Sequence, residues 1–203
     1  KGEIMQFLSE YLSQIQSISP QDKEHTYRAA LENLFGILRD NLAIHNKALQ
    51  SLHIKHEPNN DKEGRGAPDF LIQNQGLVIG YIENKRVNAD WDSIAQSQQI
   101  EKYLRLSDNL MLTDYLRFCL VRKNDKGKVH IVQEYRICDL SQLKATLKNR
   151  ALLESKEKEL TELFKLFFTF SPKPIITAQE FASTLAQRTQ ILKDSLIEAQ
   201  ENP

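Results

Sequence analysis

This chain lacks the features of composition that would point directly to a function. Its 203 residues include 27 basic and 27 acidic side chains, so no net charge points to a nucleic acid or a membrane surface as partner. Local basic patches remain compatible with this balance, because acidic site residues would offset them. Cysteine is scarce: Cys119 and Cys138 are the only two, and neither lies at a Cys/His spacing typical of zinc sites.

Long apolar runs are absent as well. No run approaches the roughly 20 residues that span a bilayer, and the most apolar short stretch covers only residues 167–170. No secretory signal peptide is recognisable. Together with the low cysteine content, this favours a reducing cytoplasm and argues against a membrane partner. The chain starts at Lys1 and ends at Pro203 directly after a helical pattern, so we expect a fragment of a longer protein.

What the sequence does contain is the element order of an α/β domain. Apolar residues at helical spacing predict helices over residues 4–18, 21–42 and 91–106. Alternating or short apolar runs predict strands over residues 69–74, 77–83, 109–113, 117–123 and 128–135, and the period is helical again after Cys138. We therefore expect a central mixed β-sheet flanked by helices. The expected division is an amino-terminal helix over 1–20, a core over 21–140 and a helical extension over 141–203.

Three charged groups lie at the same end of the hairpin predicted over residues 69–83. Asp69 opens its first strand, and Glu83 and Lys85 end the second, two residues apart and therefore on one face. Such a cluster is costly unless something binds there. Phosphodiester hydrolysis would use it, because two carboxylates can hold Mg²⁺ with open positions while a lysine orients water and offsets charge. The backbone carbonyl of Asn84 would add a metal ligand, so its side-chain identity should matter little.

This pattern, Pro68-Asp69 followed by Glu83-Asn84-Lys85, resembles the PD-(D/E)XK nuclease superfamily, which has the restriction-endonuclease-like fold. The resemblance implies a Mg²⁺-dependent hydrolase, with Mn²⁺ as a substitute, that cleaves double-stranded DNA. It also implies site residues on two helices. Glu32 matches a glutamate that members of this superfamily often carry on the helix before the first strand. It would complete the metal site. Gln99 matches the first residue of a Gln-x-x-x-Tyr motif ending at Tyr103, and would support catalysis from the same helix face.

The resemblance is greatest to the amino-terminal nuclease domains of bacterial restriction–modification enzymes in which nuclease and adenine-N6 methyltransferase share one polypeptide, some with a helicase-like ATPase. It rests on residues 27–34, 66–70, 80–85 and 112–115. It implies a type I- or IIG-like restriction endonuclease with downstream methyltransferase, recognition or helicase-like domains as partners. Only those domains would bind S-adenosylmethionine or ATP, and double-strand cleavage would favour dimerisation. Between the glutamate and the lysine of the motif, this subgroup usually carries a small residue, often Ala. Asn84 at that position departs from the pattern.

Plainer explanations exist for each part of the pattern. Without any catalytic role, Asp69 and Lys85 would form a chance salt bridge. Glu32 would then be an exposed helix charge paired with Arg28. Tyr103 would be an ordinary core residue of an amphipathic helix. The same fold would then serve as a catalytically inactive DNA-binding or interdomain scaffolding domain.

Other polar residues near the predicted site are less specific. Candidates for contact with nucleic acid are Arg65, Arg86 and Tyr103, with Lys55 as a further basic residue, although a solvated surface explains the basic ones equally well. His53 and His56 are better explained by a surface strand than by a metal-binding pair. For Asp114 a role in a turn is favoured over a role as an acid of the site. The helical extension offers a protein-interaction surface as a third alternative, through Leu163, Leu166 and Phe167.

Overall fold

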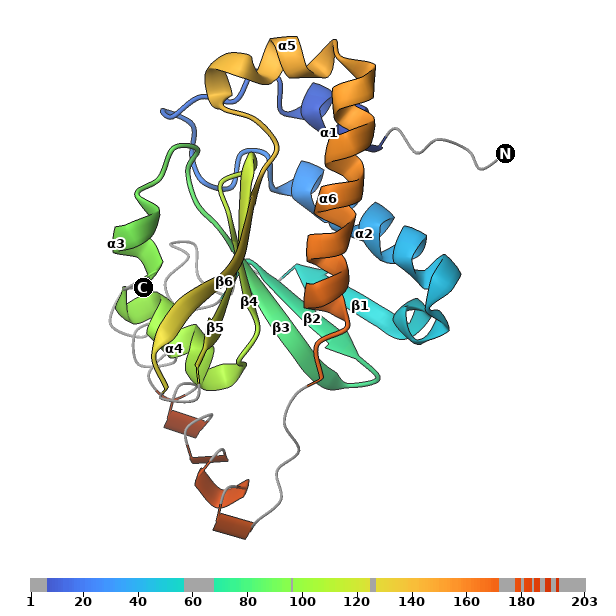
Figure 1. Cartoon of the computed structure of the whole chain (residues 1–203). Helices are drawn as coiled ribbons and strands as arrows, with labels where there is room; N and C mark the ends of the chain where they lie inside the picture. Colours follow the sequence, from blue (N-terminus) through green and yellow to red (C-terminus); the bar gives the residue numbers. More distant parts are fainter. Residues whose placement is uncertain are drawn as a thin grey trace.

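The computed structural model describes residues 7–56, 68–95, 97–124 and 127–171, together with isolated positions between 178 and 193. Within these residues the chain forms a six-stranded mixed sheet with helices packed on both faces (Figure 1). The α/β architecture expected from the sequence is therefore confirmed. In this part of the chain no helix is long and apolar enough to cross a membrane.

The strands lie in the sheet in the order in which they occur along the chain. Neighbouring strands are antiparallel except β3 and β4, which run parallel. The connection between these two carries the short helices α3 (Trp91–Ala95) and α4 (Gln98–Leu106). The strands are β1 (Leu52–His56), β2 (Phe70–Asn74), β3 (Leu77–Asn84), β4 (Leu110–Thr113), β5 (Arg117–Lys123) and β6 (Val129–Arg136).

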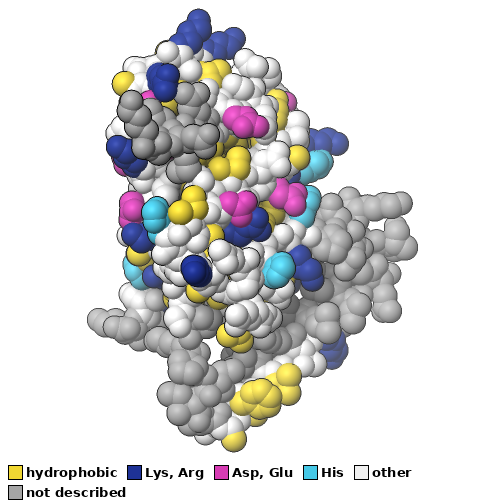
Figure 2. Space-filling view, turned by 90° about the vertical axis from the view of Figure 1, so that its right-hand side faces the viewer, with side chains coloured by type: hydrophobic (Ala, Val, Ile, Leu, Met, Phe, Trp, Pro, Cys, Tyr) yellow, Lys and Arg dark blue, Asp and Glu magenta, His cyan; other side chains and the backbone are white. Residues whose placement is uncertain are grey.

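Two sets of helices cover the two faces of the sheet. In Figure 1, α3 and α4 lie to the left of the strands, and the longer helices lie to the right. The longer helices are α1 (Phe7–Gln14), α2 (Arg28–His45) and α6 (Arg150–Phe168). Shorter helical segments make the remaining connections: η1 (Lys47–Ser51), η2 (Leu140–Gln142) and α5 (Leu143–Leu147). On the surface seen in Figure 2, basic and acidic side chains are interspersed, as the balanced composition leads one to expect.

The β2–β3 hairpin forms as its sequence predicts. Gln75 and Gly76 both have positive φ, at 49° and 82°, as in the type I′ turn that matches the twist of paired strands. The register pairs Phe70 with Ile82. Asp69, the residue before Phe70, is thereby brought to the end of β3, where the predicted charged cluster lies.

Aromatic side chains join α6 to α2 and to the sheet. Phe164 lies 5.3 Å from Phe35 of α2 and 5.7 Å from Phe118 of β5, measured between ring centroids. The same apolar cluster includes residues of α1. Residues on both sides of the expected boundaries at 20 and 140 therefore pack into one apolar cluster. On α6 the residues proposed as an exposed docking face are mostly internal, since Leu163 and Phe167 are buried and only Leu166 is exposed.

Two predicted helices have different bounds in the structure. The helix expected over 21–42 begins only at Arg28, because Asp22 closes a turn back to Ser19 and further turns follow up to Arg28. The helix expected over 91–106 is interrupted at Ser97, which adopts an extended conformation and caps the amino terminus of α4 with its hydroxyl. A capping residue marks the start of a helix, and the period of the apolar residues alone does not show where such a boundary lies. The predicted loop around Arg65 lies outside the described residues, as does most of the predicted linker after residue 171.

Candidate active site

The predicted charged cluster forms at the carboxyl end of β3. Glu83 and Lys85 project to the same side, and the Lys85 ammonium donates to Glu83 Oε1 at 2.8 Å. The chain stays extended beyond the strand because the Lys85 N–H donates to the Thr113 carbonyl at 2.7 Å. The side chains of Glu83 and Lys85 are only 5% and 13% exposed. The sheet therefore holds this ion pair largely out of water.

Asp69 completes the cluster from the residue before β2. Its Oδ2 accepts a hydrogen bond from the backbone N–H of Asn84 at 2.7 Å, which fixes the carboxylate beside the end of β3. Its Oδ1 forms an ion pair with the guanidinium of Arg28, the first residue of α2. Burial raises the pKa of Asp69, and Arg28 and the Asn84 hydrogen bond only partly oppose this.

Glu83 is the most perturbed acid of the site. Burial, and then the neighbouring charge of Asp69, raise its pKa to about 7, although Lys85 favours the ionised form. Its second oxygen, Oε2, is buried and has no hydrogen-bond partner within the described part of the chain. A buried polar atom left unpaired costs about 1–3 kcal/mol. Within the described residues, the site thus contains a buried oxygen that is available to a bound cation.

Lys85 keeps its proton in this environment. Burial disfavours the ammonium, but the carboxylates of Glu83, Glu24 and Asp69 outweigh it and raise the pKa of Lys85. Lys85 is therefore a cation while the carboxylates carry their charge. It can neutralise and orient, and it does not act as a base in this state.

Helix α4 places Gln99 against both members of the ion pair. The Gln99 side-chain oxygen accepts from Lys85 Nζ at 3.0 Å, and its nitrogen lies 3.0 Å from Glu83 Oε1 and 2.9 Å from the Tyr103 hydroxyl. Tyr103 is fully buried. It therefore positions Gln99 from the core, and its predicted contact with nucleic acid does not fit this placement.

Asn84 points away from Glu83 and Lys85, as the strand periodicity predicts, but its side chain is not inert. Its amide nitrogen donates to the Glu24 carbonyl and, at 3.2 Å, to the Tyr115 hydroxyl, while its amide oxygen accepts from Arg28 Nε at 3.1 Å. The side chain is completely buried. These contacts do not fit the expectation that its identity matters little, because removing the side chain would take away the hydrogen bond of Arg28 Nε.

The other predicted site residues lie farther out. Glu32 is not brought to the carboxylate pair: its side chain is 47% exposed and lies 3.9 Å from the imidazole of His56. His56 in turn stacks on Phe70, with ring centroids 5.2 Å apart, so it belongs to the surface strand rather than to a metal pair with His53. The predicted role of Glu32 as a metal ligand stays a prediction.

Three residues that sequence reasoning did not assign to the site shape it. Glu24 and Arg28 approach from the amino-terminal side of α2, and their electrostatic effects reach Asp69. Asp114 has the turn role that the sequence favours: its carboxylate accepts from the N–H groups of Leu116, Arg117 and Asn88. It thereby ties the loop after Lys85 to the end of β4. No local sequence pattern predicts that Arg28 belongs to the site, because its partner Asp69 is distant in the sequence.

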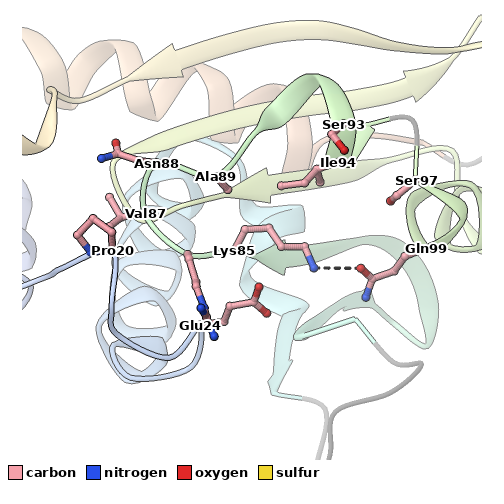
Figure 3. A pocket seen from close by; sticks show the side chains of 11 residues that line it. Pro20, Glu24, Lys85, Val87, Asn88, Ala89, Ser93, Ile94, Ser97 and Gln99 are labelled. Atoms are coloured by element: carbon pink, nitrogen blue, oxygen red, sulfur yellow. Dashed lines mark hydrogen bonds between the residues drawn. The ribbon is translucent and has the colours of Figure 1, made fainter.

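A cavity of about 530 Å³ opens beside Lys85 and Gln99. Figure 3 shows the hydrogen bond between these two side chains, with Glu24 on one side and Ser93 and Ser97 on the other. Arg86, one of the predicted nucleic-acid contacts, also lines this cavity. A molecule bound there would contact Lys85, whereas Asp69 and Glu83 are not among the residues that line the cavity.

The donor set fits a hard divalent cation only if water supplies several ligands. Among the described residues no group of three or more His, Cys, Asp and Glu side chains is arranged to hold a metal. Asp69 and Glu83 are the two carboxylates of the cluster, and the Asn84 backbone carbonyl lies between Glu83 and Lys85 along the chain. Mg²⁺ is usually held by one or two carboxylates and keeps several waters. The unpartnered oxygen of Glu83 is the observation that favours a cation here.

Comparison with known proteins gives one informative result. No protein-family model matches the chain, and no curated protein matches it. Among solved structures, the fold is similar to part of DrdV, determined by cryo-electron microscopy in a complex with DNA. The TM-score is 0.51 with 20% sequence identity, and the match covers 84% of this chain and 14% of that chain. At this identity the similarity concerns the fold, and the chain corresponds to a small part of the larger protein.

Proposed function

We propose that this chain is a Mg²⁺-dependent endonuclease domain that hydrolyses phosphodiester bonds of double-stranded DNA. The observation that carries the proposal is the buried pair of carboxylates, Asp69 and Glu83, beside Lys85 at the end of β3, where one Glu83 oxygen has no partner among the described residues. The arrangement matches the Asp and Glu-x-Lys positions that the sequence resemblance to PD-(D/E)XK nucleases implies. The similarity of fold to a protein determined in complex with DNA supports DNA as the partner.

The proposed chemistry assigns a distinct role to each group. Asp69, Glu83 and the Asn84 carbonyl would hold Mg²⁺ or Mn²⁺, which when bound supplies Lewis-acid activation of water and neutralisation of the phosphate. Lys85, held by Gln99, would direct its N–H groups toward the attacking water and the phosphate oxygens. Tyr103 would keep Gln99 in the orientation that this requires.

The cavity beside Lys85 is the proposed place for the DNA backbone. Arg86, Ser93 and Ser97 line it and offer donors to phosphate oxygens. No net positive charge draws DNA to the chain as a whole. We therefore infer that the energy of DNA binding and the recognition of the DNA sequence come largely from further domains, as in restriction–modification enzymes. Those further domains would also bind S-adenosylmethionine or ATP. Two copies would be needed to cut both strands if each has one site.

One observation favours a second candidate, a catalytically inactive DNA-binding or scaffolding domain. Each carboxylate of the site already has a basic partner, Arg28 for Asp69 and Lys85 for Glu83, so the cluster is neutralised without a metal. Such a domain would bind DNA with salt-dependent affinity but would not cleave it in Mg²⁺.

Thermal melting with and without Mg²⁺ tests the proposed metal site. A ligand that binds only the folded state raises the melting temperature, so the wild type is expected to gain stability in Mg²⁺ and Glu83→Ala to gain much less. Glu101→Ala, on α4 and 57% exposed, is the matched control and should respond like the wild type. An equal response of wild type and Glu83→Ala would reject Glu83 as a ligand.

A further inference from the structure

Arg28 is placed where its charge is unfavourable unless Asp69 is present. It is the first residue of α2, where the helix dipole disfavours a cation. That helix has no acidic residue in its first turn and no side-chain cap. The Arg28 and Asp69 side chains are only 13% and 12% exposed. The arginine is therefore retained at this position by the carboxylate, against the local preference of the helix.

Asn84 holds the arginine at this position. Its side-chain oxygen accepts from Arg28 Nε at 3.1 Å, while the neighbouring guanidinium nitrogen contacts Asp69 Oδ1. The Asn84 amide is itself fixed by the Glu24 carbonyl and the Tyr115 hydroxyl. The backbone N–H of the same residue donates to the other oxygen of Asp69. One residue thus positions both members of the ion pair.

A cation bound to Asp69 would lie next to the guanidinium. Two positive groups so close in a site shielded from water repel each other strongly. The same carboxylate therefore cannot serve Arg28 and a divalent cation equally well, and one must give way.

We propose that Arg28 is a counter-ion for Asp69 in the metal-free protein, which a divalent cation must displace, and that Asn84 is the positioning residue that holds it there. The inference rests on the proposed function, because it assumes that Asp69 is a metal ligand. Arg28 neutralises the carboxylate until the metal arrives and lowers the apparent metal affinity. Held at Nε by Asn84, the displaced guanidinium would stay at the site.

Isothermal titration calorimetry with Ca²⁺ or Mg²⁺ alone tests the competition. Arg28→Gln should bind the metal at least about tenfold more tightly than the wild type, because the repelling charge is gone. Arg28→Lys keeps the charge and should stay within about threefold of the wild type. A merely structural role of Arg28 would instead weaken metal binding in both variants.

The sign of the change decides the outcome. Equal or weaker binding by folded Arg28→Gln, with wild-type binding that Asp69→Ala abolishes, would overturn the counter-ion proposal and leave the metal site standing. Absence of any binding that depends on Asp69 would overturn both.

A second measurement uses the unmodified chain, in case Arg28→Gln does not fold. The Arg28 Nε–H resonance, identified by its loss in Arg28→Lys, should shift during a Ca²⁺ titration of ¹⁵N-labelled protein. An unchanged resonance at metal saturation would overturn the proposal. Asn84→Ala should also raise metal affinity, by less than Arg28→Gln, because the arginine is then held less firmly.

Discussion

The raised pKa of Glu83 predicts a specific pH dependence of stability in the metal-free protein. The folded state keeps the Glu83 proton up to a pKa of about 7, whereas the group ordinarily loses it near 4.5. Between these values the folded state binds more protons than the unfolded state, so stability falls as pH rises. At about 1.4 kcal/mol per pH unit, the loss contributed by this group amounts to about 3 kcal/mol between pH 4.5 and pH 7.

Glu83→Gln removes this titration and keeps the shape of the side chain. The free energy of unfolding of the variant minus that of the wild type should therefore rise by about 3 kcal/mol between pH 4.5 and pH 8. Urea unfolding in EDTA at several pH values measures this difference, and terms that do not depend on pH cancel in it. Glu101→Gln, which removes an exposed carboxylate of α4, should give a flat difference.

A difference that stays constant to within about 0.5 kcal/mol, smaller than one pH unit of linkage, would contradict the raised pKa of Glu83. It would mean that Glu83 ionises in the folded state as easily as in the unfolded state. The buried and unpartnered environment described for its carboxylate would then be incorrect. Addition of Mg²⁺ at pH 8 should stabilise the wild type more than Glu83→Gln, because only ionised Glu83 would bind the cation.

Further predictions concern packing. Gly80→Ala should destabilise the chain by about 1–3 kcal/mol in thermal or urea unfolding, because the new methyl group would lie 2.5 Å from the Asn109 carbonyl. Gly36→Ala on α2, where nothing lies within 4 Å of the added carbon, should instead stabilise by about 0.5–1 kcal/mol, and destabilisation there would contradict the helical environment. Phe164→Ala should cost about 3–5 kcal/mol, and a chain ending at residue 140 should fail to fold. A folded truncation by circular dichroism would show that α6 is dispensable.

The sheet and the centre of the site could be predicted from the sequence because their signals are local. Alternating or short apolar runs predicted the strands β2 to β6, and the period of two placed Glu83 and Lys85 on one face of β3. The spacing of Gln99 and Tyr103 gave one helix face, and the structure shows their hydrogen bond. These relations depend on residues a few positions apart.

The remaining features depend on contacts between distant segments. The Arg28–Asp69 ion pair and the hydrogen bonds of the Asn84 side chain form only when α2 packs on the sheet. The break at Ser97 arises because a side-chain cap outweighs a continuous apolar period. Packing of α6 on the sheet was not predicted, because an amphipathic period shows that a helix has a buried face but not what covers it.

The most direct test of the central claim is cleavage of DNA by the full-length protein that contains this chain, followed under single-turnover conditions in Mg²⁺. Wild type and Glu101→Ala should cut, whereas Asp69→Ala and Lys85→Ala should lose the activity by two or more orders of magnitude (about 10²-fold or more), as should the wild type in EDTA. Cleavage that persists unchanged in Asp69→Ala and Lys85→Ala would contradict the account. Failure of the wild type to cleave with every combination of metal, ATP and S-adenosylmethionine, while it still binds DNA, would contradict it equally.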